Sequence, residues 1–165
     1  MSNTDLVRAS RDGDQFHYLW AARRCLLLLS PNATLKAVTI EGPSKFETEE
    51  SLPVVAGEEL IDVGEYYGSE SLEQATLFRY IQLKHSTERV DVAWVPSELK
   101  KTIEGFAKRY KELQNLLGEV CLNNKIEFWF VSNRPINTEF LGTIQDVAKG
   151  SPARNTNDLK KLEKF

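Results

Sequence analysis

The sequence predicts an α/β protein in which helices flank a mixed β-sheet. Along its 165 residues, the patterns follow the order helix, three strands, helix, strand, helix. The three consecutive strands are typical of a β-meander, because they follow one another along the chain with no helix between them. The last strand comes after a long helix, so a helical crossover leads into it. A meander combined with a crossover indicates a mixed sheet covered by helices.

Composition narrows the possible classes of protein. The apolar and charged fractions, 41% and 27%, are ordinary for one soluble domain. A net charge of −3 gives no global basic footprint, so any nucleic-acid contact must come from a local patch. Cys25 and Cys121 are the only cysteines, and we expect two buried free thiols in a cytoplasmic protein. The polar start excludes a signal peptide, and the longest apolar run, residues 25–29, is too short for a membrane span.

The first helix is expected over residues 14–29. Residues 1–12 are polar and predict a flexible N-terminal arm, and Asp12-Gly13-Asp14 is a helix-start signal. The leucines at positions 26–29 make the end of this helix apolar all round. A helix that is apolar on every side is normally buried, so we expect this end to lie in the core.

The three strands are expected over residues 34–41, 58–67 and 77–85, as neighbours in one sheet. Residues 44–57 are acidic and irregular and predict a surface loop between paired strands. In the third strand, the period of two places Gln82 and Lys84 on one face. Lysine is rarely buried without a partner, so an anion or a hydrated metal ion is expected over this pair.

The second half of the chain repeats the alternation of helix and strand. Residues 90–95 predict a connector or short strand, and a long amphipathic helix follows from Pro96 to Gly118. Residues 125–131 predict a buried strand, and a last helix ends at Gly150. Residues 151–165 are expected to be a linker or the start of a further C-terminal region.

Polar residues that could do chemistry lie on the three neighbouring strands. Glu41 ends the first, Asp62 lies inside the second, and Gln82 and Lys84 lie on the third. Mg²⁺ usually binds one or two carboxylates together with water and substrate phosphate. A lysine beside such an ion can stabilise charge on a transferring phosphate. Each residue also has a structural alternative: Glu41 as an exposed strand-end acid, Gln82 as a satisfied buried amide and Lys84 as a rim residue.

Four short motifs carry a resemblance to a known family. They are Gly13-x-x-Phe16-x-Tyr18, Ile40-Glu41-Gly42-Pro43, Ile61-Asp62-Val63 and Tyr80-Ile81-Gln82-Leu83-Lys84. From residue 13 to about residue 135 the chain resembles the restriction-endonuclease-like PD-(D/E)xK nucleases. It is more closely similar to the double-stranded-DNA endonuclease domain at the N-terminus of bacterial antiphage defence effectors. The resemblance implies an αββαβ core within a nuclease domain over residues 13–150, and a Mg²⁺- or Mn²⁺-dependent endonuclease that hydrolyses phosphodiester bonds in DNA.

The resemblance also implies roles for individual residues. Asp62 stands at the metal-binding aspartate, Gln82 replaces the usual acid, and Lys84 is the motif lysine. Glu41 and the backbone carbonyl of Leu83 would be further metal ligands. The sequence departs from the superfamily pattern in having glutamine at position 82 and no proline before Asp62.

Other polar residues are candidates for supporting roles. Gln15, near His17 at the start of the first helix, is a possible residue behind the metal ligands. Ser86, Arg89 and Arg134 could contact the phosphate backbone. Arg134 follows a strand, and binding sites often open at the carboxyl ends of strands.

The expected partners are double-stranded DNA and further copies of the chain, joined through a missing C-terminal region. One such site has one cleavage centre, so a duplex break needs two copies. The alternative is a nuclease-fold module that no longer cuts and only binds nucleic acid or mediates oligomerisation.

Overall fold

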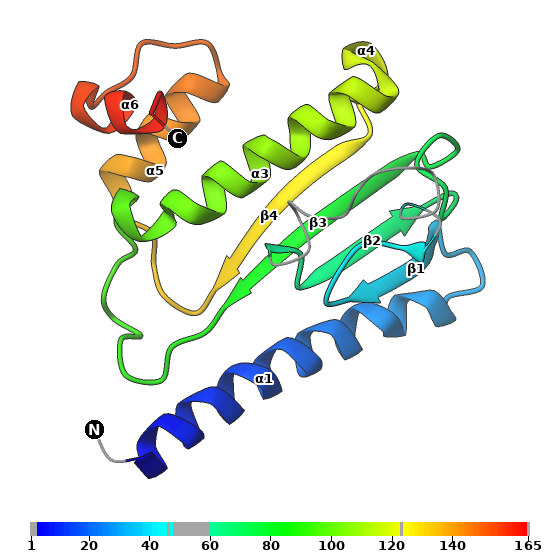
Figure 1. Ribbon diagram of the computed structural model, residues 1–165, viewed down its shortest axis with the longest axis horizontal. Coiled ribbons are helices and arrows are strands. Elements are labelled where there is room, and N and C mark those ends of the chain that lie inside the picture. The colour runs from blue at the N-terminus through cyan, green and yellow to red at the C-terminus, as the bar shows by residue number, and fades with distance from the viewer. Residues whose placement is uncertain (1–2, 46, 48–59, 123, 165) are drawn as a thin grey trace.

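The predicted α/β class is confirmed: a four-stranded mixed sheet lies between helices (Figure 1). The computed structural model describes residues 3–45, 47, 60–122 and 124–164. The elements are, in order, α1 (Asn3–Cys25), the 3₁₀ helix η1 (Leu26–Leu29), β1 (Leu35–Ile40), β2 (Val63–Tyr67), β3 (Leu77–Lys84), α3 (Pro96–Leu117), α4 (Glu119–Leu122), β4 (Ile126–Ser132), α5 (Thr138–Ala148) and α6 (Thr156–Leu162).

The strands are arranged in the order β1-β2-β3-β4. β1 pairs antiparallel with β2, and β2 pairs antiparallel with β3, so the consecutive strands form the predicted meander. After the crossover through α3 and α4, β4 pairs parallel with β3, with Lys84 opposite Ser132 at the end of the pair. The last strand therefore makes the sheet mixed, as predicted.

The second strand is shorter than the sequence pattern predicts. The pattern indicates a strand over residues 58–67, whereas β2 covers Val63–Tyr67. Residues 58 and 59 lie outside the described residues, and Asp62 occupies a bend directly before the strand. Aspartate is disfavoured within strands, which agrees with a strand that begins one residue after it. Most of the predicted loop at 44–57 also lies outside the described residues.

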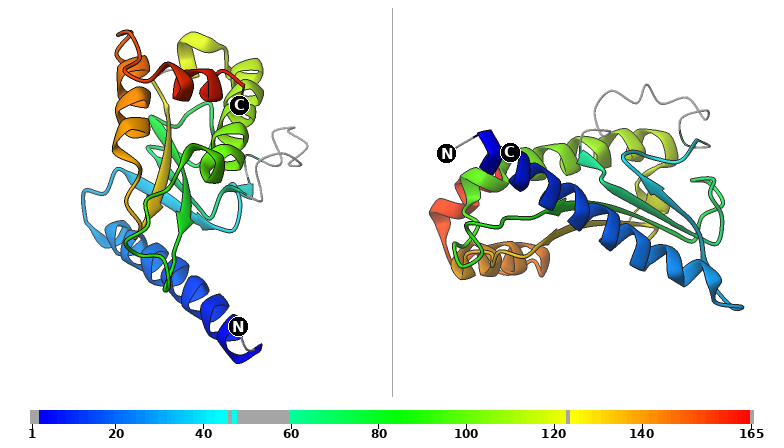
Figure 2. Two further views of the ribbon diagram at one scale, coloured as in Figure 1. Left: turned by 90° about the vertical axis from the view of Figure 1, so that its left-hand side faces the viewer. Right: turned by 90° about the horizontal axis from the view of Figure 1, so that it is seen from below.

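The first helix is longer than predicted and ends differently. α1 begins at Asn3, so it runs through the start signal at 12–14 and through most of the segment predicted as a flexible arm. A glycine inside a helix costs only about 1 kcal/mol, so Gly13 does not have to end the helix. Figure 2 shows the N-terminal part of α1 projecting beyond the sheet.

The predicted burial of the leucine run is wrong. Leu26–Leu29 form η1, and their side chains are between 37% and 77% exposed. α1 packs on the sheet through residues one and two turns earlier, including Ala21. The change to a 3₁₀ helix at Leu26 alters the angle between successive side chains. The leucines are therefore not held against the sheet by the stripe that buries α1.

α1 and α3 cover opposite faces of the sheet (Figure 2), and an apolar cluster lies under each of these helices. The cluster under α1 contains the buried residues Ala21, Val63, Ile81 and Leu83. The cluster under α3 is larger and includes Tyr66, Phe78, Tyr80, Leu113 and Leu122. β3 supplies alternate residues to both clusters, which confirms the period-two prediction for this strand.

A buried charged cluster anchors α1 to the sheet. Glu65 on β2 is fully buried and accepts hydrogen bonds from Arg24 of α1 and from Nη1 of Arg79 on β3, the latter at 2.7 Å. The Tyr67 hydroxyl donates to Glu65 at 2.8 Å, and Nε of Arg79 donates to Glu127 on β4 at 2.7 Å. These bonds fix the register of α1 over three adjacent strands.

The C-terminal half follows the predicted order of elements, but the prediction of a buried strand at residues 125–131 is wrong. β4 lies at the edge of the sheet, and each of its residues is half-buried or exposed. α3 ends just before Gly118, whose φ of 78° is readily adopted by glycine. Asn137 caps α5 by accepting a hydrogen bond from the amide of Phe140 at 3.0 Å. Residues 156–162, predicted as part of a linker or a new helix, form α6 beside α5 (Figure 1). None of the described helices is both long enough and apolar enough to cross a membrane.

Candidate functional site

The structure brings Glu41, Asp62 and the end of β3 together at one end of the sheet. Glu41 follows β1 and Asp62 precedes β2, and the antiparallel pairing places these positions beside each other. The amide of Glu41 donates to the carbonyl of Asp62 at 2.9 Å, and the amide of Asp62 donates to the carbonyl of Ile81 at 3.0 Å. Glu41 has a φ of 58°, a left-handed conformation that few residues other than glycine adopt. Such conformations are concentrated at functional sites.

The carboxylate of Asp62 lies against the backbone of β3. Its Oδ2 accepts a hydrogen bond from the amide of Leu83 at 2.6 Å, and its Oδ1 is 3.9 Å from Nδ1 of His17. Burial raises the pKa of the Asp62 carboxyl, and the negative charge of Glu41 acts in the same direction. The hydrogen bond from Leu83 and the charges of His17 and Lys84 lower this pKa, but burial prevails. Ionised Asp62 is therefore short of positive charge.

His17 is the residue that α1 contributes to the site. Its Nε2 lies 3.1 Å from the carbonyl oxygen of Leu83, so the imidazole ring spans that carbonyl and the carboxylate of Asp62. Sequence reasoning favoured Gln15 instead, but Gln15 is exposed. Residues two positions apart do not share a helix face. The signal that identifies His17 is Ala21, one turn later and buried against the sheet.

Lys84 ends β3 with an exposed side chain. Its positive charge lowers the pKa of Asp62. Within the described residues, however, Lys84 makes no ion pair, so its ammonium group is available to a ligand. The neighbouring His85 stacks on Phe16 of α1, with 5.0 Å between the ring centroids. This ring contact packs the residue after β3 against α1.

Gln82 does not share a contact with Asp62, contrary to the expected convergence. Its side chain is buried, and its Oε1 accepts a hydrogen bond from the hydroxyl of Thr102 on α3. The carboxylate of Asp62 contacts the backbone of β3 and the imidazole of α1 instead. Asp62 lies in a bend, so strand periodicity does not determine where its side chain points. The structural alternative, a satisfied buried amide, describes Gln82 in this structure.

Ser86 and Arg89 support the chain that leaves β3. The side chain of Asn133 donates to the carbonyl of Ser86 at 2.7 Å and accepts from its amide at 3.0 Å. The hydroxyl of Ser86 accepts a hydrogen bond from the amide of Arg89 at 3.0 Å. Arg89 forms an ion pair with Glu98 at 3.0 Å, but its side chain is half exposed. Arg89 can therefore still exchange this partner for an anion.

Arg134 cannot make the phosphate contact expected from the sequence. It is only 6% exposed, and its Nε donates to the carbonyl of Val92 at 2.7 Å. Its guanidinium lies 3.8 Å from the ring centroid of Trp94 and also binds Glu98 at 3.2 Å. Arg134 therefore holds the connector before α3 against the end of β4. A position after a strand was compatible with either role, because the sequence does not show how closely the connector before α3 approaches Arg134.

The oxygen donors at the site suit a hard divalent cation. Among the described residues, no group of three or more His, Cys, Asp or Glu side chains is placed to hold a metal ion. Mg²⁺ does not need such a group, since it usually binds one or two carboxylates and retains several waters. Asp62 and Glu41 supply two carboxylates, and His17 contacts both the carboxylate of Asp62 and the carbonyl of Leu83. This set fits Mg²⁺ or Mn²⁺.

No protein-family model matches the chain, and no curated protein matches it. The assignment of function therefore depends on the residues of the site and on the motifs that they belong to.

Proposed function

We propose that the chain is a metal-dependent DNA endonuclease domain with a restriction-endonuclease-like αββαβ core. The observation that carries the proposal is that Glu41 and Asp62 lie side by side at the end of the sheet where β3 ends in Lys84. The order helix, meander, helix, strand supports the same assignment. The resemblance of the motifs supplies the substrate class, double-stranded DNA.

The carboxylates of Asp62 and Glu41, with the carbonyl of Leu83, would hold Mg²⁺ or Mn²⁺. When bound, such an ion polarises a phosphoryl oxygen and lowers the pKa of a bound water. Asp62 is suited to hold a cation because burial raises its pKa, which makes the ionised carboxylate unfavourable without a positive partner. A cation relieves this penalty and favours the ionised form.

Lys84 supplies positive charge to the reacting phosphate. Hydrolysis by water breaks a phosphorus–oxygen bond to the sugar and places additional negative charge on the phosphate oxygens in the transition state. An exposed ammonium at the end of β3 can donate hydrogen bonds to these oxygens or to the attacking water. Lys84 has no ion pair within the described residues, so it does not have to break one in order to bind the phosphate.

His17 and Gln82 hold neighbouring groups of the site in position. A carbonyl oxygen only accepts hydrogen bonds, so the contact with Leu83 requires the proton on Nε2 of His17. The imidazole then holds the carbonyl of Leu83 near the carboxylate of Asp62. Gln82 fixes β3 to α3 through Thr102 on the opposite face, directly behind these groups.

A second candidate is a nuclease-fold module that binds nucleic acid or mediates oligomerisation without cutting. Two observations favour it: the glutamine that stands in place of an acid is bound to α3, and no group of three metal-ligating side chains occurs in the described residues. Both candidates fit the N-terminal effector region of a larger bacterial antiphage defence protein, acting as an assembly of copies.

A plasmid assay distinguishes these candidates. Supercoiled DNA is incubated with the chain in Mg²⁺, Mn²⁺ or Ca²⁺, and nicked and linear products are followed with time. We expect cleavage in Mg²⁺ and Mn²⁺ but not in Ca²⁺, and we expect Asp62→Asn to abolish it. Asp91→Asn, an exposed acid in the connector before α3, is the matched control and should cut normally. DNA binding without cleavage in any of these ions would support the second candidate.

A further inference from the structure

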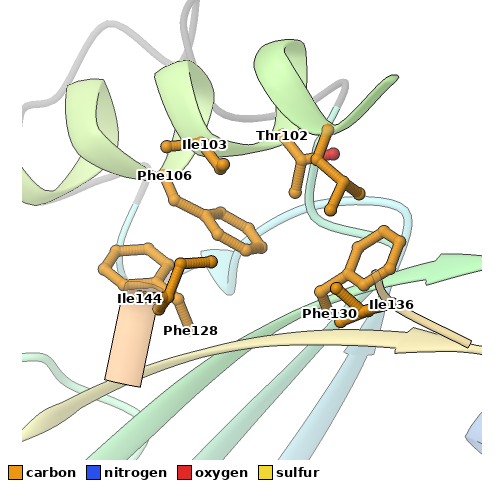
Figure 3. Close-up of a pocket in the computed structure, with 8 residues that line it drawn as sticks. Thr102, Ile103, Phe106, Phe128, Phe130, Ile136 and Ile144 are labelled. Atoms are coloured by element: carbon orange, nitrogen blue, oxygen red, sulfur yellow. The ribbon is translucent and has the colours of Figure 1, made fainter. Parts of the chain in front are cut away.

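A cavity of about 240 Å³ lies between α3, β4 and α5 (Figure 3). Its eight lining residues are Leu99, Thr102, Ile103, Phe106, Phe128, Phe130, Ile136 and Ile144. Seven of them are apolar, and every one is buried or half-buried. Leu99 and Thr102 are buried and the other six are half-buried, so the cavity opens to solvent and a ligand can enter it.

The aromatic rings of the walls make contacts with other rings. Phe106 and Phe128 pack on each other with ring centroids 4.9 Å apart. Phe130 meets the ring of Trp94 edge to face, with 5.7 Å between centroids. These contacts fix the positions of the three rings relative to their neighbours. In proteins, a rigid apolar cavity of on the order of 150 Å³ already stays dry and binds benzene.

The lining chemistry defines what the cavity can hold. None of its lining residues is charged, so a charged ligand would lose its hydration without gaining a counter-ion. Thr102 is the one lining side chain with a polar group, and its hydroxyl hydrogen is donated to Gln82. The wall therefore offers no side-chain donor to a carboxylate or a phosphate. None of the lining side chains is among the large apolar side chains that are exposed. The cavity therefore suits a small molecule better than the surface of another protein.

We propose that this cavity is a binding site for a small, neutral aromatic molecule of one or two rings. The site is separate from the Asp62 site, since Gln82 and Thr102 lie on the α3 side of the sheet and Asp62 contacts α1. The proposal does not depend on nuclease activity.

The test is a titration of the wild-type chain with indole, followed by methyl NMR of labelled isoleucines. Ile103, Ile136 and Ile144 line the cavity, and their δ1-methyl signals should shift and saturate together. Ile81 is buried on the α1 side and Ile40 is exposed on β1, so their signals should remain unchanged. The absence of saturable shifts at the three lining residues, or equal shifts at all five, would overturn the proposal.

Two comparisons test the location and the chemistry. Ile144→Phe adds volume to the cavity wall and should remove the saturable shifts, whereas Val147→Phe, at an exposed position of the same helix, should keep them. Indole-3-carboxylate should bind the wild-type chain at least about tenfold more weakly than indole, because its charge finds no partner. Binding of indole that survives Ile144→Phe, or equal binding of the carboxylate, would refute the assignment. The wild-type titration decides the matter even where a variant fails to fold.

Discussion

Replacement of Lys84 by alanine should separate catalysis from stability. The side chain is exposed at the end of β3 and forms no ion pair within the described residues, so its removal leaves no buried charge behind. Exposed substitutions of this kind usually change the free energy of unfolding by less than about 0.5 kcal/mol. Loss of one electrostatic stabiliser in the transition state costs at least about a hundredfold in rate, or about 2.7 kcal/mol.

The assay measures three properties of the same preparation. Single-turnover plasmid nicking in Mg²⁺ gives the rate, thermal melting gives the stability, and a gel-shift titration in Ca²⁺ gives the affinity for DNA. We expect the rate to fall while melting and affinity stay unchanged, because affinity for DNA is distributed over many phosphate contacts. Lys36→Ala is the matched control, since Lys36 is an exposed strand lysine near the other end of β1.

Cleavage at the wild-type rate by a folded Lys84→Ala variant would refute the role of Lys84. A Lys84→Ala variant that reaches the wild-type rate only at saturating DNA would refute the catalytic role in a different way. In that case Lys84 would bind the substrate and the transition state equally, and it would not be a catalytic stabiliser.

Three further variants test the surroundings of the site. Asp62→Asn removes a carboxyl whose pKa is raised by burial. In EDTA, the variant should therefore have a higher melting temperature than the wild type at pH 7. This difference should vanish as the pH falls towards 3.8, the ordinary pKa of an aspartate. A lower melting temperature at pH 7 would contradict the direction of this shift. His17→Ala should weaken Mn²⁺ binding, measured by electron paramagnetic resonance, by about 10- to 100-fold, whereas an unchanged affinity would show that the imidazole does not position the ligands. Glu65→Gln should lower the free energy of unfolding in urea by about 3 kcal/mol, because Arg24 and Arg79 lose a buried partner. A change below 1 kcal/mol would show that water replaces the carboxylate.

The faces of β3 could be predicted from the sequence because a strand has a fixed period. The alternation places Ile81 and Leu83 on one face and Tyr80 and Gln82 on the other, as the clusters confirm. The period does not say which helix covers each face. It also does not apply to Asp62, which lies in a bend, so the expected contact with Gln82 did not follow.

The errors in α1 have a related cause. The helix-start signal at residues 12–14 lies within the helix, because local propensity does not determine where a helix ends. The leucine run is apolar, but burial also requires a surface to pack against, and α1 contacts the sheet earlier. His17 was missed for the same reason, since its role depends on the rotation of α1 over β3.

The connector before α3 should belong to the same cooperative unfolding unit as the sheet. The amide of Trp94 donates to the carbonyl of Pro135 at 2.8 Å, and the amide of Asn137 donates to the carbonyl of Trp94 at 3.0 Å. The buried guanidinium of Arg134 binds the carbonyls of Val92 and Ala93 from the other side. To open this segment alone would take these carbonyls from the buried guanidinium and leave Glu98 as its remaining acceptor. Its amides should therefore exchange with deuterium at the slow rate of core strands, although the segment has the sequence of a loop.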